Sequence, residues 1–392
     1  MATPACYTHV KMSAPGIEIE LPCSKSIALR ALALRYSTGL DIPLHSMTPC
    51  KDIDEMERGL RLLAGAHEGD HIRIGISEGA APFRFLTALA ASTPGVRSMI
   101  IPGSRLAERP IGQLVEALRG VGAEITLLRE GALDITGRRI EGGVAEIDNS
   151  ISSQFESALL LASPLWERGL SLPEPDRREP SAPYRMMTRR MLDIFKSHPG
   201  SFIIEGDWSA ASYFFEARII AASMGRTLRF SFPSLGPVAE SLQGDSRIAN
   251  FTEEIMATVG VFTADMRSTP DLVPALAVGC ALGGRGFRFS GTANLRHKES
   301  DRIEALAMEL GHLGYRLDVS EENGTTISCD GVRRATNGNI TINPHGDHRM
   351  AMAFAMAKTA IPDVIIENPG VVEKSFPGFW EETAKIPQLS TT

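Results

Sequence analysis

The sequence predicts an α/β (α+β) protein made of two similar domains. Its 392 residues exceed what one hydrophobic core usually fills, so two domains of ordinary size are expected. One pattern also recurs along the chain: an amphipathic helix, a glycine just past its end, and two short β-type segments separated by a turn. Hydrophobic residues make up 43% and charged residues 22%, which is typical of globular proteins.

Four copies of this repeat are easily recognised. The first has apolar residues at helical spacing from Met56 to Leu63, ends at Gly65 and continues into residues 71–76. Each glycine suits a left-handed helix cap. A solenoid is the alternative, but the chain changes character near its middle instead of stacking continuously. The other clear copies end at Gly122, Gly260 and Gly314, and weaker ones at 186–195 and 380–386 bring the count to six, three in each half.

The pattern restarts near Pro22 and again within residues 204–222, and these restarts predict the domain crossings. We therefore expect one discontinuous domain of residues 1–20 and 205–392. Residues 21–204 would form the second domain, inserted into the first.

The charge balance and the cysteines exclude several function classes. The 40 basic and 47 acidic residues give a formal charge of −7, which disfavours nucleic acid or an anionic membrane as the main partner. No apolar run reaches the length of a membrane span and residues 1–16 lack the core of a signal peptide, so a cytoplasmic location is expected. Five scattered cysteines predict buried thiols, namely Cys6, Cys23, Cys50, Cys280 and Cys329.

The segment 22–34 has the composition of an anion site. Ser24, Lys25, Ser26 and Arg30 stand at the start of a helix whose later face is Ala and Leu. Free N–H groups, hydroxyls and two cations would converge there on a phosphate or carboxylate. The segment is not a P-loop, because the glycine-rich lead-in is absent. A serine-capped helix with solvated charges explains it equally well.

Two other motifs suggest different chemistry. Residues 75–79 match the nucleophile-elbow spacing around Ser77, but such short matches are common by chance and a six-unit repeat is not the architecture that displays an elbow. His345, Asp347 and His348 suggest a metal, but no second cluster supplies further ligands. A turn with a helix-capping Asp explains them as well, so we expect no metal.

Several cations stand at the edges of apolar segments. Each cation taken singly is a solvated surface charge. Together, however, they are more cations than the binding of a neutral substrate requires. If the repeats bring these edges to one cleft, two multiply charged anions can bind side by side. The residues are Arg105, Arg109, Arg302, Arg349 and Lys374.

Nine segments, in order and nearly end to end, resemble the 3-phosphoshikimate 1-carboxyvinyltransferase (5-enolpyruvylshikimate-3-phosphate synthase) family. They include SKSIALRAL, SSQFESALLLASPL, NLRHKESDRI and GDHRMAMAFAMA. The resemblance implies two domains of three βαβαββ units each, with the active site in the cleft between them. The repeat count agrees with this independently.

The resemblance also implies an enzyme that transfers the enolpyruvyl group of phosphoenolpyruvate to the 5-hydroxyl of shikimate 3-phosphate and releases phosphate, in the shikimate pathway of aromatic amino-acid biosynthesis. Asp271 would accept the hydroxyl proton, Glu299 would protonate the methylene carbon, and Lys25 would stabilise developing charge. A helix N-cap is the alternative role for Asp271. No cofactor is implied, and we expect a monomer whose partners are these two small molecules.

The family's binding residues transfer by motif. Those implied for shikimate 3-phosphate are Lys25, Ser26, Arg30, Ser152, Ser153, Gln154, Ser181, Asp271, Asn294 and Lys298. Those implied for phosphoenolpyruvate are Lys25, Ala80, Arg109, Gln154, Arg302, Arg349 and Lys374. A helix N-cap at 152–154 and a turn at Ser181 are the structural alternatives.

One loop departs from the family pattern. The family usually has Gly-Asn-Ala-Gly-Thr-Ala-x-Arg where residues 77–84 read SEGAAPFR. Ala80 in place of Gly is expected to narrow the phosphoenolpyruvate pocket and reduce glyphosate sensitivity. Glu78 in place of Asn puts a carboxylate near an anion site, so a non-catalytic binding protein of the same fold is one alternative. The elbow spacing around Ser77 leaves a serine hydrolase as another. A related transferase acting on a nucleotide sugar generally uses a loop cysteine, and none lies between Pro94 and Pro110.

Overall fold

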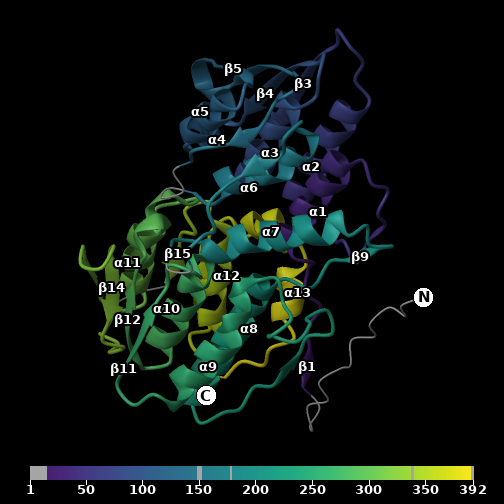
Figure 1. Cartoon of the computed structure of the whole chain (residues 1–392). Coiled ribbons are helices and arrows are strands. Elements are labelled where there is room, and N and C mark those ends of the chain that lie inside the picture. Colours follow the sequence, from purple (N-terminus) through teal and green to yellow (C-terminus); the bar gives the residue numbers. More distant parts are fainter. Residues whose placement is uncertain (1–15, 148–151, 177–178, 337–339, 390–392) are drawn as a thin grey trace. The chain divides into compact units, whose positions relative to one another are not determined.

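The computed structural model describes residues 16–147, 152–176, 179–336 and 340–389 (Figure 1). The chain divides into two compact units. We call Lys25–Ile204 the inserted unit, and the residues up to Ser24 together with those from Glu205 onward the discontinuous unit.

The inserted unit is built on a four-stranded mixed sheet. Strand β3 (His71–Ile76) pairs in parallel with β4 (Arg97–Pro102), and β6 (Leu133–Thr136) and β5 (Glu124–Leu127) follow in antiparallel pairs. Because parallel neighbours need a crossover, the helix α3 (Ala80–Ala91) lies between β3 and β4 in the chain.

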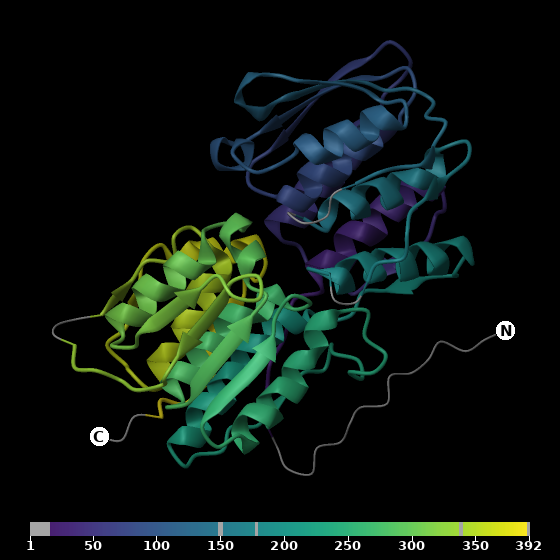
Figure 2. The same cartoon turned by 60° about the vertical axis from the view of Figure 1, so that its left-hand side comes forward.

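The discontinuous unit repeats this topology. Strand β11 (Val261–Asp265) pairs in parallel with β12 (Gly286–Ser290), and β14 (Thr326–Cys329) and β13 (Leu317–Ser320) follow in antiparallel pairs. Helix α10 (Val273–Leu282) makes the parallel crossover. Figure 2 shows these strands side by side as green arrows.

Two smaller parallel sheets complete each unit within the described ranges. Three sheets in each unit agree with three repeats in each half of the chain, and the predicted two-domain α/β fold is confirmed. The pairs are β2 (Leu44–His45) with β9 (Phe202–Ile203), β7 (Gly143–Val144) with β8 (Leu170–Ser171), β1 (Ile17–Glu18) with β10 (Phe230–Ser231), and β15 (Thr341–Ile342) with β16 (Ile365–Ile366).

Amphipathic helices occupy the positions that the repeat predicts. Two of them, α5 (Gly112–Gly120) and α11 (Arg302–His312), are followed by two antiparallel strands, as the repeat predicts. The other two are followed by β3 and β11, and each of these strands leads into a crossover helix instead of a second strand. Gly122, Gly260 and Gly314 have positive φ, whereas Gly65 has φ −89°, so the left-handed cap expected there is wrong. These helices are α2 (Lys51–Ala64), α5 (Gly112–Gly120), α9 (Ile248–Ala257) and α11 (Arg302–His312).

Each unit also has a centre of three mutually packed helices (Figure 1). These helices are buried on nearly every side, which explains their almost continuous Ala, Leu and Phe content. They are α1 (Lys25–Thr38), α3 and α6 (Gln154–Ala162) in the inserted unit, and α8 (Trp208–Ser223), α10 and α12 (His348–Met356) in the discontinuous unit. The remaining α-helices are α4 (Ser104–Ala107), α7 (Ala182–Lys196) and α13 (Phe379–Thr383).

Two sequence expectations concern the chain as a whole. None of the helices described is both long and apolar enough to cross a bilayer. Cys23, Cys50, Cys280 and Cys329 are buried, as predicted, and Cys6 lies outside the described residues.

Candidate active site

A buried guanidinium organises the charged cluster of the discontinuous unit. Arg302, the first residue of α11, is 1% exposed and donates to three carboxylates. Its Nη1 lies 2.9 Å from Asp271 Oδ1, its Nη2 3.1 Å from Glu299 Oε2, and its Nε 2.7 Å from Asp347 Oδ2. The two carboxylates predicted to be catalytic are therefore held by one side chain.

Three further cations contact the same two carboxylates. Arg349 Nη2 lies 2.8 Å from Asp271 Oδ2, and Lys298 Nζ lies 3.6 Å from Asp271 Oδ1. Lys374 Nζ lies 3.2 Å from Glu299 Oε1. With Arg302 these make four cations in contact with the carboxylates of Asp271, Glu299 and Asp347.

The pKa directions follow from this packing. Burial acts to raise the pKa of Asp271, but Arg349, Lys298 and Arg302 outweigh it and hold that pKa well below its usual range. Burial likewise acts to lower the pKa of Arg302, and Asp347, Asp271 and Glu299 reverse the direction. Asp271 is therefore ionised at neutral pH.

The alternative role of Asp271 as a helix cap is wrong. Asp271 lies inside the 3₁₀ turn Pro270–Leu272, the residue at the N-cap of α10 is Leu272, and no side-chain cap bond forms there. Its oxygens contact Arg302, Arg349 and Lys298. Asp347, by contrast, caps α12 as predicted, because its side chain accepts from the Arg349 N–H.

In the inserted unit, Arg84 joins three segments that carry predicted binding residues. Its Nη1 donates to Gln154 Oε1 at 2.7 Å and to Ser152 Oγ at 3.0 Å, and its Nη2 donates to Pro110 O at 2.8 Å. Its guanidinium also stacks on the Phe155 ring at 4.8 Å. Arg84 is 3% exposed, so it fixes these contacts away from water.

Lys25, the first residue of α1, is paired with a carboxylate that the motif did not include. Its Nζ lies 2.8 Å from Asp52 Oδ2 on α2. The Asp52 side chain is 5% exposed and that of Lys25 is 16% exposed, so the lysine is the more accessible member of the pair.

Arg30 is a buried cation whose hydrogen-bond partners among the described residues are neutral oxygens. Its Nε donates to Thr188 Oγ1 at 2.7 Å, its Nη1 to Ser26 O at 2.8 Å and its Nη2 to Ser157 Oγ at 3.1 Å. Burial lowers its pKa to about 10. A charge buried among neutral partners is costly unless an anion joins it.

The other predicted residues are placed as follows. Ala80, the first residue of α3, is buried, and Arg109 follows α4 and is partly buried. Ser153 and Asn294 are also buried. Ser181 precedes α7 with φ 56°, a left-handed conformation that a serine seldom adopts, and such strain is concentrated at functional sites.

The two rival motifs acquire structural roles. Ser77 Oγ and Ser77 N both donate to Glu55 Oε1, so its hydroxyl is bonded to a carboxylate and not to the histidine of a hydrolase. His345 Nε2 lies 2.8 Å from Glu309 Oε1. Within the described ranges no group of three or more His, Cys, Asp or Glu side chains is arranged to hold a metal ion.

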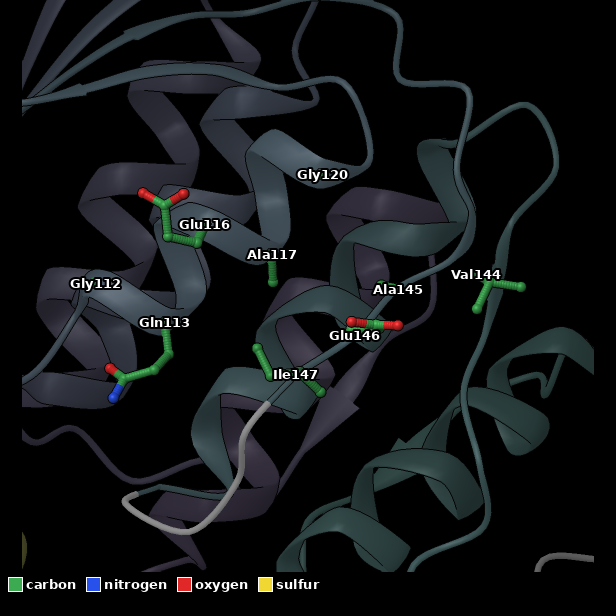
Figure 3. A pocket seen from close by; sticks show the side chains of 9 residues that line it. All are labelled: Gly112, Gln113, Glu116, Ala117, Gly120, Val144, Ala145, Glu146 and Ile147. Atoms are coloured by element: carbon green, nitrogen blue, oxygen red, sulfur yellow. The ribbon is translucent and has the colours of Figure 1, made fainter.

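A large cavity of the inserted unit includes none of these residues. It measures about 990 Å³ and lies beside α5 (Figure 3). The charged side chains that line it are the carboxylates Glu116 and Glu146, which suit an anionic ligand poorly. The described residues that line it are Gly112, Gln113, Glu116, Ala117, Gly120, Val144, Ala145, Glu146 and Ile147.

Comparison with known proteins decides the family. The family model described as EPSP synthase (3-phosphoshikimate 1-carboxyvinyltransferase) matches residues 16–198 and 195–383. The chain belongs to the EPSP synthase family. A 3-phosphoshikimate 1-carboxyvinyltransferase of Bacteroides fragilis is 36% identical over 95% of this chain and 97% of its own length. The one from Methanoculleus marisnigri is 33% identical over 79% of this chain and 78% of its own.

A solved EPSP synthase shares the fold. The structure from Acinetobacter baumannii matches with a TM-score of 0.65 at 19% identity and covers 95% of this chain and 96% of that one. The predicted resemblance is therefore confirmed, for both the family and the α/β architecture.

Sequence reasoning missed three residues of these clusters. Arg84 ends the family's glycine-rich loop pattern, so the motif already contained the signal for it. Asp347 was predicted only as a cap, although it also holds Arg302. Asp52 gave no signal, because the sequence near the start of α2 does not reveal that its carboxylate meets Lys25.

Proposed function

We propose that this chain transfers the enolpyruvyl group of phosphoenolpyruvate to the 5-hydroxyl of shikimate 3-phosphate and releases phosphate. The observation that carries the proposal is the contact of Arg302 with both Asp271 and Glu299. The reaction needs two carboxylates in different roles, and one rigid guanidinium sets their spacing.

In the proposed mechanism the 5-hydroxyl adds across the double bond of phosphoenolpyruvate. Asp271 receives the hydroxyl proton while the new C–O bond forms, and Glu299 gives a proton to the methylene carbon. The tetrahedral intermediate then breaks its C–O bond to the phosphate group, which leaves with the proton held by Asp271, and the methyl carbon returns a proton to Glu299 as the double bond re-forms. Lys25 and the neighbouring cations stabilise the developing charge.

The proposed binding roles follow the charges. Arg30, whose hydrogen-bond partners are neutral, would pair with an anionic group of shikimate 3-phosphate. Arg349, Lys374 and Arg302 would bind phosphoenolpyruvate, because guanidinium and ammonium groups donate well to phosphate and carboxylate oxygens. The remaining residues proposed for the two substrates are Lys25, Ser26, Ala80, Arg109, Ser152, Ser153, Gln154, Ser181, Asn294 and Lys298.

The test is phosphate release from a mixture of purified protein, shikimate 3-phosphate and phosphoenolpyruvate. We expect steady turnover that Glu299→Gln abolishes, because an amide is too weak an acid to protonate carbon. Glu304→Gln is the matched control, since Glu304 is exposed on α11, the helix that follows Glu299. Thermal unfolding of both variants checks that they fold.

Other outcomes would favour the alternatives. Binding of both compounds without phosphate release would favour a non-catalytic protein of this fold, and covalent labelling of Ser77 by an organophosphate would favour a hydrolase. We further propose a monomer in the cytoplasm. Sedimentation equilibrium tests the first part and microscopy of a tagged protein in its own cell tests the second.

A further inference from the structure

Glu55 on α2 holds the loop that precedes α3. Its Oε1 accepts from the backbone N–H of Ser77 at 2.9 Å and also from the Ser77 hydroxyl. Glu55 is 5% exposed, so both bonds form away from water, where a hydrogen bond to a charged group is strong.

The same loop is packed closely on two other segments. An added Cβ at Gly103 would lie 2.2 Å from the Ser77 carbonyl oxygen, and the Gly103 N–H donates to Ile76 O at 2.8 Å. An added Cβ at Gly79 would lie 2.9 Å from Asp52 Oδ1, one turn before Glu55 on α2. Residues 76–79 are thus fixed between α2 and the segment that starts at Gly103.

These contacts connect three residues proposed to bind one substrate. Asp52 is the partner of Lys25, Ala80 follows Gly79 directly, and the segment from Gly103 leads through α4 to Arg109. The loop pattern of the family has Gly at position 77, whereas this chain has a serine whose hydroxyl adds a bond to Glu55.

We infer that Glu55 is a positioning residue for phosphoenolpyruvate binding. Through its hydrogen bonds to Ser77 it fixes the loop that lies among Lys25, Ala80 and Arg109. This inference rests on the proposed function. Glu55 acts on the loop and not on the reacting atoms, so it sets substrate affinity more than the rate of the chemical step.

Steady-state kinetics of Ser77→Ala and Glu55→Gln test the inference. Each variant is expected to raise KM for phosphoenolpyruvate by about ten-fold, because a charged hydrogen bond is lost or weakened. Both kcat and KM for shikimate 3-phosphate should change by less than about two-fold. Ser77→Thr, which keeps the hydroxyl, should restore KM. The double variant should fall short of the product of the single effects, since both remove one contact.

Matched controls separate this role from a general loss of packing. Ser98→Ala removes a buried hydroxyl that has no hydrogen-bond partner among the described residues, and Glu116→Gln changes an exposed helix carboxylate of the same unit. Both should leave KM for phosphoenolpyruvate unchanged. A folding defect would instead lower the active fraction and so the apparent kcat.

The outcomes distinguish the two proposals. Wild-type protein without turnover would overturn the proposed function and the inference with it. Turnover with an unchanged KM for phosphoenolpyruvate in both Ser77→Ala and Glu55→Gln would overturn the inference alone. If Ser77→Ala does not fold, the isosteric Glu55→Gln decides by itself.

Discussion

Asp271 and Arg349 are joined by a 2.8 Å contact between Oδ2 and Nη2, although 78 positions separate them in the chain. The other oxygen of Asp271 accepts from Arg302 at 2.9 Å. A carboxylate that accepts hydrogen bonds from two guanidinium groups has a lowered pKa, so Asp271 is a weak base in the ligand-free protein. Its proposed role as proton acceptor therefore requires the bound substrate anions to draw these cations away.

Asp271→Asn should lower kcat by about 10² to 10⁴-fold, the usual range for a lost general base. Because cations hold the pKa of Asp271 well below its usual range, it stays ionised as the pH falls through 5. The acid limb of the kcat/KM profile should therefore be the same in wild type and in Asp271→Asn. A displaced limb would show that Asp271 titrates there. Asp318→Asn, an exposed acid of the same unit, is the control.

Arg30→Gln should abolish stabilisation by shikimate 3-phosphate. In the wild type this ligand supplies the negative charge that the partners of Arg30 lack, so its binding should raise Tm. In the variant we expect Kd to rise about 100-fold, while Tm without ligand does not fall, because a buried charge has been removed. Arg35→Gln on the same helix is the control. Equal ligand-induced shifts in Tm would contradict this role.

Ala80→Gly should increase sensitivity to glyphosate. Ala80 is 5% exposed at the start of α3, and removing its methyl group enlarges whatever site it borders. One methyl group discriminates between ligands by about 10-fold or more, so the inhibition constant should fall by about that factor with less change in KM for phosphoenolpyruvate. Inhibition titrations measure it, with Ala81→Gly as the neighbouring control. No change would show that Ala80 does not border the inhibitor.

Asp245→Asn should change how stability depends on pH. Burial, and after it the Asp271 carboxylate, raise the pKa of Asp245 from 3.8 to about 6. Because this pKa is raised in the folded state, the contribution of Asp245 to the free energy of unfolding is fully present below about pH 3.8 and is lost as the pH rises through about 6. The variant stays neutral, so its advantage over wild type should grow across this window to roughly 2–3 kcal/mol and then level off. Urea unfolding at pH 4 and pH 7 measures this, and the exposed Asp363→Asn should show no such trend.

The sequence predicted the features that depend on residues close together in the chain, such as the amphipathic helices. Helical spacing and glycine positions located α2, α5, α9 and α11, because periodicity is a property of neighbouring residues. The hand of the cap at Gly65 was not predictable in the same way. Its φ of −89° shows that a glycine permits a left-handed cap without requiring one.

The candidate site was predicted as a set of residues and not as a set of contacts. The motifs named Gln154 but not Arg84, which holds it, and they named Asp271 and its partners Arg302, Arg349 and Lys298 without showing which of them meet. Arg84 reaches Gln154 across 70 positions and Arg302 reaches Asp347 across 45. Such pairs depend on how helices and strands pack, and the spacing within a motif contains no information about it.

Glu216→Met should stabilise the protein, because Glu216 is a buried acid at a position that suits an apolar side chain. It lies on α8 with no exposed surface, and within the described ranges neither carboxylate oxygen has a hydrogen-bond partner. Burial raises its pKa well above 4.5, so the folded protein keeps it protonated. Methionine has a similar unbranched length and fits beside Gly279, where an added Cβ would lie 3.1 Å from Glu216 Cγ.

We expect Glu216→Met to gain about 1–3 kcal/mol, the cost of an unsatisfied buried polar group. Because the folded pKa is raised, wild type loses stability as the pH rises above 4.5, so the gain should be larger at pH 8 than at pH 5. Urea unfolding at both pH values measures it, and Glu254→Met on the exposed side of α9 should give no such gain. A variant less stable than wild type at both values would mean that the carboxyl group makes a stabilising contact, and the penalty assigned to its burial would be wrong.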